Sequence, residues 1–444
     1  MIRTSSSHWR AVVLVAALCL TLSACSARTG DSGGGQGGNA AEGSFTTAGC
    51  DGYQASPGVT DSSILIGSSL PVTGPLAAAG KERFGWQAYF DYVNSQGGVD
   101  GRKLEFKALD DGYDPAKTSQ NVRQLTTQDQ VFALGGALGT APVLSFAADT
   151  QASCIPNLMA ATGAPVFAQS KYSWTLPALP TYSAEASVLA TYAKSSGMKT
   201  VALIAQNDDF GRGYTAALTS QLQGSGITVV DSETFEVGDS TVSTQISKLA
   251  NSGADAVLVA ALGTKCVQIM NGIAGTSWRP EILAGALCTN KSLLDAMDPS
   301  AKQKMISTQW SKSPSDPQWT NDPAMKTYRE AIARYAPEAD PNEDFVLNAW
   351  TWAQILVEII KKAPALTRAG VMGSARTADV HVGTMLDGIN FTTGQNDYAP
   401  IESLQPVRFD PATGRFRSID PGTGDFLGAG KSSVVSFEGK SVPK

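Results

Sequence analysis

Histidine is almost missing from this sequence, which has only His8 and His381 among its 444 residues. His8 lies in an N-terminal segment that we expect to be removed, so the mature chain keeps His381 alone. A single histidine argues against a histidine-dependent catalytic triad. The stretch from Ser196 to Lys199 reads S-x-x-K without the companion S-D-N and K-T-G motifs, and we interpret it as coincidence. We therefore expect no enzyme, with an exported hydrolase as the weaker alternative.

The sequence also lacks an excess of basic residues. Its 34 lysines and arginines stand against 40 acidic residues, and the net charge of −6 becomes −8 when Arg3 and Arg10 are lost with the N-terminal segment. Nothing in this balance predicts a nucleic-acid-binding surface. The hydrophobic fraction of 42% and the charged fraction of 17% are typical of a globular protein, and the length suffices for two domains.

The first residues have the features of an export signal. Arg3 and Arg10 are followed by the apolar stretch 11–22, which is too short to span a bilayer. Leu22, Ser23 and Ala24 then precede Cys25, a pattern that resembles the bacterial lipobox. This resemblance implies a signal peptide over 1–24 and acylation of Cys25, which would hold the protein at the outer face of the cell membrane. The alternative is ordinary signal-peptidase cleavage that leaves Cys25 as a spare thiol.

Residues 25–49 are rich in Gly, Ser, Ala and Asn and contain few large apolar side chains. This composition predicts a flexible tether between the membrane anchor and the folded body. A disordered tail without that role is the alternative.

A series of alternating strands and helices begins at Ile64. We expect a buried strand over 64–66, a polar turn at Gly67, and a helix that opens at Thr73, Gly74 and Pro75 and runs to residue 94. Further strands are expected at 104–109, 131–134 and 155–159, and the last two end in turns rich in Gly, Ala and Thr. Such turns lie at the carboxyl edge of a parallel sheet, where α/β proteins bind ligands.

A second series begins near residue 200, with strands expected at 201–205, 228–231, 256–260 and 281–284. Strands that alternate with helices predict parallel sheets joined by right-handed crossovers. Because the series restarts, we expect two α/β lobes.

Four cysteines remain beyond Cys25, an even number that predicts disulfides in an exported protein. Three pairings are possible. We favour Cys50 with Cys154 and Cys266 with Cys288, because each pair then stays within one lobe. The cysteine spacing does not fit a zinc site, and Gly135, Gly136 and Gly139 do not complete a dinucleotide-binding fingerprint. We expect neither a metal nor a cofactor.

The order of these segments resembles a known family. The run from Ile64 to Pro75, the acidic turn at Asp110 and Asp111, the Ala-Thr turn at residues 161–162 and the Asp-Asp-Phe-Gly stretch at 208–211 are similar to type I periplasmic solute-binding proteins of the leucine/isoleucine/valine-binding branch. The similarity covers about residues 59–417. It implies two Rossmann-like lobes, joined by three hinge crossovers, that close over a solute.

Mapped onto this chain, the resemblance places lobe one at residues 50–176 and 312–394, and lobe two at 177–309 and 396–444. The three crossovers would lie near 174–180, 307–313 and 393–405. Trp350 and Trp352 are interpreted as packing residues, and Asp110 and Asp111 as structural turn residues.

The resemblance also implies the ligand-binding residues. A carboxylate would meet backbone N–H groups and small hydroxyls in two turns of lobe one, while an aromatic wall and the facing turn of lobe two would complete the site. The residues so predicted are Thr73, Gly139, Thr140, Ala141, Ala161, Thr162, Asp208, Phe210, Gly263 and Thr264.

One feature departs from the family pattern. Amino-acid binders commonly hold the solute's ammonium with a carboxylate that follows the strand at 281–284, but residues 285–289 contain neither Asp nor Glu. An unpaired ammonium in a dry cleft would cost several kcal/mol. Either Asp208 or Asp209 takes this role, or the solute has no ammonium. Branched-chain amino acids and related small organic acids or amides therefore stay open.

The resemblance implies a monomer that delivers its solute to an ABC permease in the membrane. The alternative is a ligand-sensing subunit of a membrane receptor, which would share the same fold and cleft.

Overall fold

The computed structural model describes residues 43–428 and 431–437. The predicted signal peptide, the lipidation of Cys25 and most of the predicted tether lie outside these residues. No helix within the described ranges has the length and apolar character that a membrane span requires.

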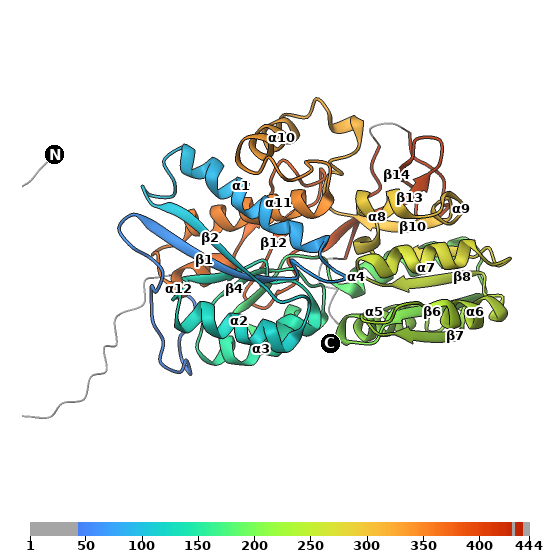
Figure 1. Ribbon diagram of the computed structural model, residues 1–444, viewed down its shortest axis with the longest axis horizontal. Coiled ribbons are helices and arrows are strands. Elements are labelled where there is room, and N and C mark those ends of the chain that lie inside the picture. The colour runs from blue at the N-terminus through green and yellow to red at the C-terminus, as the bar shows by residue number, and fades with distance from the viewer. Residues whose placement is uncertain (1–42, 429–430, 438–444) are drawn as a thin grey trace, which may run out of the picture. The chain divides into compact units, whose positions relative to one another are not determined.

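The first sheet is wholly parallel, with the strand order β2-β1-β3-β4-β5 in the described part of the chain. Its strands are β1 (Ser63–Leu70), β2 (Lys103–Asp110), β3 (Ala133–Gly135), β4 (Asn157–Ala160) and β5 (Thr175–Pro177). Helices cover both faces, as parallel sheets require. In Figure 1, α1 (Glu82–Ser95), α10 (Pro323–Tyr335) and α11 (Asp344–Lys362) lie on one side of the sheet, and α2 (Pro115–Thr127) and α3 (Thr140–Ala152) on the other. The helix α12 (Arg368–Ala375) packs against α11.

Two predicted boundaries at the start of this lobe are wrong. β1 does not end at Gly67 but continues through two buried serines to Leu70, because the Ser69 hydroxyl donates to Asp111 Oδ2 at 2.7 Å. The following helix does not open at Thr73, whose hydroxyl donates to Asp110 Oδ2 at 2.6 Å instead of capping a helix. A 3-10 turn, η1 (Ala79–Lys81), leads directly into α1.

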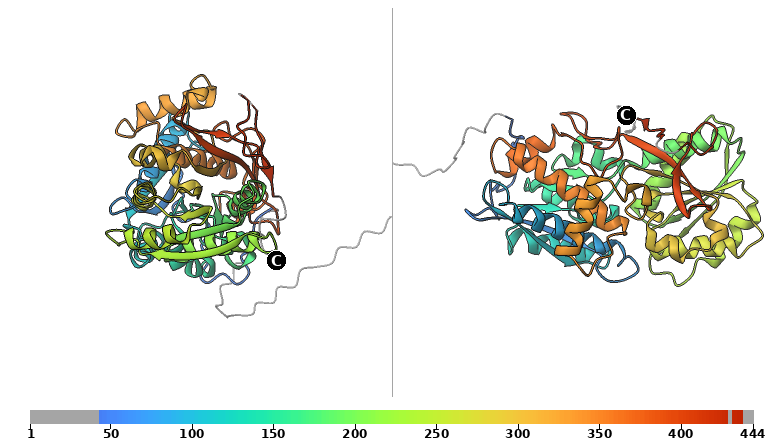
Figure 2. Two further views of the ribbon diagram at one scale, coloured as in Figure 1. Left: turned by 90° about the vertical axis from the view of Figure 1, so that its right-hand side faces the viewer. Right: turned by 90° about the horizontal axis from the view of Figure 1, so that it is seen from above.

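The strands predicted for the second sheet are parallel, as expected, and C-terminal strands that were not predicted make the sheet mixed. Its parallel strands are β6 (Thr200–Gln206), β7 (Thr228–Phe235), β8 (Ala256–Ala260), β9 (Glu281–Ala284) and β10 (Met305–Gln309). The C-terminal strands β13 (Ser403–Asp410), β14 (Arg415–Ser418) and β15 (Val435–Ser436) add to it in antiparallel orientation. Figure 2 shows these strands, coloured red, beside the green and yellow elements of the second sheet.

Alternating residues of the second sheet enter two different cores. Ala202 and Ile204 of β6 pack in a cluster with residues of α6 (Ser243–Ser252) and α7 (Thr264–Ala274). Val201 and Leu203 belong instead to the cluster that includes α4 (Tyr182–Ser195) and α5 (Asp209–Leu222) and continues into the first sheet. The two-residue period of a strand thus separates the two faces. The short elements η4 (Ala286–Cys288), α8 (Lys291–Ala296) and α9 (Pro299–Lys302) follow β9.

The described chain passes between the sheets three times. It leaves the first sheet after β5, returns after β10, and leaves it again between β12 (Phe391–Thr392) and β13. β12 pairs with β11 (Asp379–Val380) in a small ladder, and three short 3-10 turns complete the lobe: η2 (Pro165–Ala168), η3 (Ser170–Tyr172) and η5 (Pro317–Trp319). The predicted α/β fold of two lobes is therefore confirmed. We call the elements of the first sheet lobe one and those of the second sheet lobe two.

Both predicted disulfides are present. Cys50 is bonded to Cys154 across 104 residues of sequence, and Cys266 is bonded to Cys288 across 22 residues. Loop-closure entropy predicts a stabilisation of about 4 to 5 kcal/mol for the first and about 3 kcal/mol for the second. The second disulfide ties the start of α7 to η4, and so joins two turns at the carboxyl edge of lobe two.

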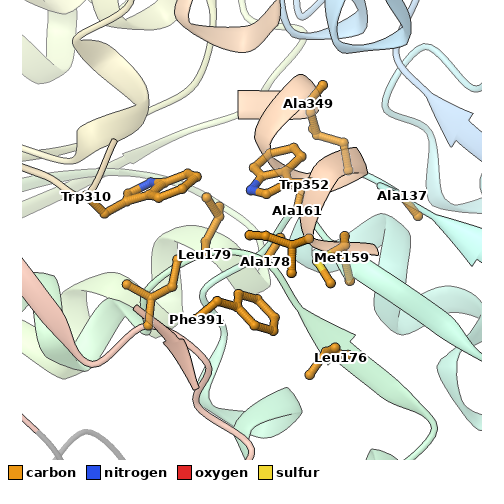
Figure 3. Close-up of a cluster of buried hydrophobic side chains, with 14 of the residues drawn as sticks. Ala137, Met159, Ala161, Leu176, Ala178, Leu179, Trp310, Ala349, Trp352 and Phe391 are labelled. Atoms are coloured by element: carbon orange, nitrogen blue, oxygen red, sulfur yellow. The ribbon is translucent and has the colours of Figure 1, made fainter. Parts of the chain in front are cut away.

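A buried apolar cluster lies where the ends of β4 and β5 meet α11 (Figure 3). Trp352 of α11 stacks on Trp310, with ring centroids 6.5 Å apart and an interplanar angle of 11°. Ala161 and Leu179, which follow β4 and β5, lie in the same cluster. This packing fixes the floor of the cavity described next.

Candidate functional site

A cavity lies between the carboxyl edges of the two sheets. Its volume in this structure is about 30 Å³. Lobe one contributes the turns after β3 and β4 together with α11, and lobe two contributes the turns after β6, β8 and β9. Because most lining side chains are apolar, the cavity suits a small molecule with a largely apolar body.

Two helix N-termini, one from each lobe, begin at this cavity. Gly139 precedes α3 and Gly263 precedes α7, both glycines line the cavity, and no side chain caps either helix. The first N–H groups of a helix have no partner within it, and the helix dipole favours negative charge there. At α7 the N–H groups of Lys265 and Cys266 already donate to the carbonyl oxygens of Leu262 and Gly263, so the start of α3 is the better place for an acidic group.

Both glycines are required by close approach and by backbone conformation. Their φ values are +98° at Gly139 and +54° at Gly263, in the region that favours glycine. A Cβ atom on Gly139 would run into the ring of Tyr113. On Gly263 it would lie 2.7 Å from the carbonyl oxygen of Pro75, across the contact between the lobes. The turn at Gly263 is thus a point at which lobe two touches lobe one.

Three hydroxyls form a buried group beside the start of α3. Thr140 Oγ1 lies 2.8 Å from Thr162 Oγ1 and 2.9 Å from the Tyr182 hydroxyl, and the last two are 3.3 Å apart. Burial raises the pKa of Tyr182 to about 12, so its hydroxyl keeps its proton. Thr140 and Tyr182 line the cavity, where they can donate to a bound oxygen.

Phe210 supplies an aromatic wall from lobe two. Its side chain is 2% exposed, lines the cavity and meets the ring of Tyr182 edge-on, with centroids 5.4 Å apart. Ring contacts of this kind fix the wall in one position. The structure thus brings Gly139, Thr140, Ala161, Phe210 and Gly263 together at the cavity, with Thr162 bonded directly to Thr140.

The remaining predicted residues do not line the cavity. Thr73 is bonded to Asp110, and Asp208 caps α5 by accepting the Gly211 N–H at 3.1 Å. Ala141 is the second residue of α3, and Thr264 is the first residue of α7 and is exposed.

Several lining residues were missed from the sequence. Helix α11 contributes Phe345, Asn348 and Trp352, whose spacing of three and four residues places them on one helix face. That spacing is visible in the sequence, but a face that packs in a core has the same pattern. Glu82 was also missed, although it stands at the first position of α1.

The model of the family described as "periplasmic binding protein" matches residues 63–414. The chain belongs to this family. The family consists of proteins that bind small-molecule solutes, not of enzymes, so this periplasmic binding protein is not an enzyme.

Named relatives agree with this assignment. The protein is 24% identical over 316 residues to a Leu/Ile/Val-binding protein homolog of Brucella melitensis. The matched region covers 70% of this chain and 82% of the relative. It resembles the structure of a possible leucine/isoleucine/valine-binding protein from Rhodopirellula baltica, with a TM-score of 0.71 and 21% identity. The match covers 81% of this chain and 97% of that protein. It also resembles the structure of a fatty acid ABC transporter substrate-binding protein from Thermomonospora curvata, with a TM-score of 0.69 and 21% identity. The match covers 87% of this chain and 94% of that protein. At these identities the two structures show the fold.

Proposed function

We propose that this periplasmic binding protein captures a branched-chain amino acid, or a related small organic acid or amide, between its lobes and delivers it to an ABC permease. The lipid on Cys25 would keep the protein at the outer face of the membrane, where the permease is embedded. The observation that carries the proposal is a cavity enclosed by both lobes, with an uncapped helix N-terminus from each lobe at its wall.

Closure of such a cavity supplies the signal for delivery. A solute shifts the equilibrium between open and closed lobes only through its different affinity for the two states. Gly139 and Thr140 of lobe one and Phe210 and Gly263 of lobe two can all contact one molecule. A bound solute therefore gains contacts from lobe two only when the lobes close.

The chemistry of the walls supports a solute with one acidic end and an apolar body. The start of α3 and the Thr140 hydroxyl supply donors for a carboxylate, while Leu76, Leu262 and Phe210 supply apolar surface. Relatives are named as binding leucine, isoleucine and valine or fatty acids, and each of these molecules has one acidic end and an apolar body.

A thermal-shift screen of the purified protein tests the proposal. The panel contains leucine, isoleucine, valine, aromatic amino acids, short-chain acids, amides and sugars. We expect at least one amino acid, acid or amide to raise the melting temperature in proportion to the logarithm of its concentration, because a ligand of the native state stabilises it by mass action. Sugars serve as the control class. If no acid, amide or amino acid shifts the melting temperature, the proposed function is wrong.

A further inference from the structure

Glu82 is a buried carboxyl group without a partner at the wall of the cavity. It is 1% exposed, and its Oε2 atom has no hydrogen-bond partner among the described residues. The neighbouring cations are directed elsewhere: Lys81 Nζ lies 3.1 Å from Glu343 Oε1, and Arg83 donates to the Gly80 carbonyl oxygen at 2.9 Å. Among the described residues, Glu82 is the only acidic side chain that lines this cavity.

Such a group is costly for the protein by itself. Burial raises the pKa of Glu82 well above its ordinary value, and no charged neighbour offsets the effect. An unsatisfied buried carboxyl destabilises the folded state, so a partner from outside the chain would relieve that cost. The cavity is the place from which that partner can come.

The two carboxylates that the sequence offered for an ammonium are already occupied. Asp208 accepts the Gly211 N–H and a hydrogen bond from Gln206 Nε2 at 2.5 Å. Asp209 is paired with Arg212 at 2.9 Å, and its side chain is 46% exposed. Neither residue lines the cavity. The lobe-two turn after β9 contributes Leu287, which is apolar.

We propose that Glu82 of lobe one binds the amino group of the solute, in place of the lobe-two carboxylate that this chain lacks. The inference rests on the proposed function and narrows it to solutes with a protonated amine. The positive charge of the amine would favour the ionised form of Glu82, at the first position of α1, and form a charge-assisted hydrogen bond to its carboxylate. The solute's carboxylate would remain with the start of α3.

Matched pairs of solutes test this assignment by isothermal titration calorimetry on the purified protein. Each amino acid is paired with the same acid lacking the amine: leucine with 4-methylpentanoate, valine with 3-methylbutanoate, and phenylalanine with 3-phenylpropanoate. We expect the wild-type protein to bind at least one amino acid at least tenfold more tightly than its partner. Glu82→Gln should remove that difference by weakening the amino acid at least tenfold while leaving the deaminated acid unchanged or tighter.

Asp209→Asn is the matched control, because Asp209 is also an acidic residue at the first position of a helix but is paired and exposed. It should retain the wild-type preference. Thermal melting checks the fold of Glu82→Gln, which should be no less stable than the wild type because it loses a buried unpaired carboxyl.

Four results would overturn the assignment. Tighter binding of the deaminated acids by the wild type, or an equal loss of both solutes in Glu82→Gln, would exclude Glu82 as the amine partner while leaving the proposed function intact. Loss of the preference in Asp209→Asn would transfer the role to lobe two. If the wild type binds nothing in the screen, the proposed function fails and this inference fails with it.

Discussion

Thr140 illustrates what a single hydroxyl contributes to the cavity. It stands at the first position of α3, lines the cavity and is bonded to Thr162 and Tyr182. Replacing it by valine keeps the shape of the side chain and removes the hydroxyl, both as donor and as acceptor. Thr162 and the Tyr182 hydroxyl still lie 3.3 Å apart, so they can satisfy one another.

We expect Thr140→Val to weaken the binding of a carboxylate solute by about 1.5 to 3 kcal/mol, roughly ten- to a hundredfold, as for hydrogen bonds to charged groups. Isothermal titration calorimetry with the solute that gives the largest thermal shift measures this loss of affinity. The matched control is Thr150→Val on the same helix, because the Thr150 hydroxyl donates only to the backbone carbonyl oxygens of Phe146 and Ala147. If both substitutions weaken solute binding equally, the Thr140 hydroxyl does not bind the solute.

Sequence reasoning found several cavity residues that lie at or just after strand ends, and it missed those on helices α1 and α11. Gly139, Thr140 and Ala161 follow strand ends that can be recognised from buried runs and Gly-rich turns. Trp352 and Glu82 lie within helices, where the residue pattern gives the helix face but not what that face meets. Only the packing of α1 and α11 against each other decides that these side chains reach the cavity.

The N-termini of two helices meet at the contact between the lobes. Asp344 at the start of α11 accepts the Lys291 N–H of α8 at 3.1 Å and the Ser313 hydroxyl at 3.3 Å. Beside it, Glu343 Oε2 accepts the Ser292 hydroxyl at 3.0 Å while its other oxygen pairs with Lys81. These bonds join lobe two to lobe one outside the cavity.

Asp344 should make the stability of the protein depend on pH. Burial raises its pKa to about 7, whereas an aspartate in the unfolded chain titrates near 3.9. Between these values the unfolded state is ionised and the folded state keeps its proton, so the free energy of unfolding falls as pH rises from about 4 to about 7. Asp344→Asn, which resembles the protonated form, should lose this part of the slope and exceed the wild type in stability by a few kcal/mol at pH 8.

Urea unfolding at pH 4.5, 6 and 8 measures this difference. Other buried acids, such as Glu185, titrate in both proteins and cancel when the wild type is subtracted from the variant. If the difference in the free energy of unfolding between the two proteins stays constant across this pH range, the role given to Asp344 is contradicted.

The elements themselves were predictable where their signals are local. The strands β8 and β9 begin and end where the buried runs in the sequence indicated. β1 was predicted too short because Ser69 finds its partner in Asp111, 42 residues away, and no local rule anticipates a hydrogen bond of that range. The antiparallel direction of β13 was missed for a similar reason, since strand direction depends on where the chain crosses between lobes.

The arrangement in two lobes follows from the restart of the strand-helix series. Closure of the lobes depends on how closely Gly263 of lobe two approaches lobe one. A methyl group at this position would lie 2.7 Å from the Pro75 carbonyl oxygen and 2.8 Å from Leu76 Cδ2, both in lobe one. We therefore expect Gly263→Ala to hold the lobes apart and to weaken solute binding at least tenfold.

Gly253→Ala is the control for an alanine at a positive-φ glycine that lies away from the contact between the lobes. Gly253 also has a positive φ, +63° against +54° at Gly263, but a Cβ there would meet nothing within 4 Å. Gly253 has ψ +22°, in the left-handed helical region where a Cβ costs about 1 to 2 kcal/mol, whereas Gly263 has ψ −135°, outside that region, and only Gly263 lies between the lobes. Gly253→Ala should therefore bind solute as the wild type does.

Small-angle X-ray scattering of the wild type, Gly263→Ala and Gly253→Ala, each with and without saturating solute, tests solute-driven closure directly. We predict that the solute lowers the radius of gyration of the wild type and of Gly253→Ala, and leaves that of Gly263→Ala unchanged. An unchanged radius of gyration in the solute-saturated wild type would contradict closure of the two lobes over the cavity.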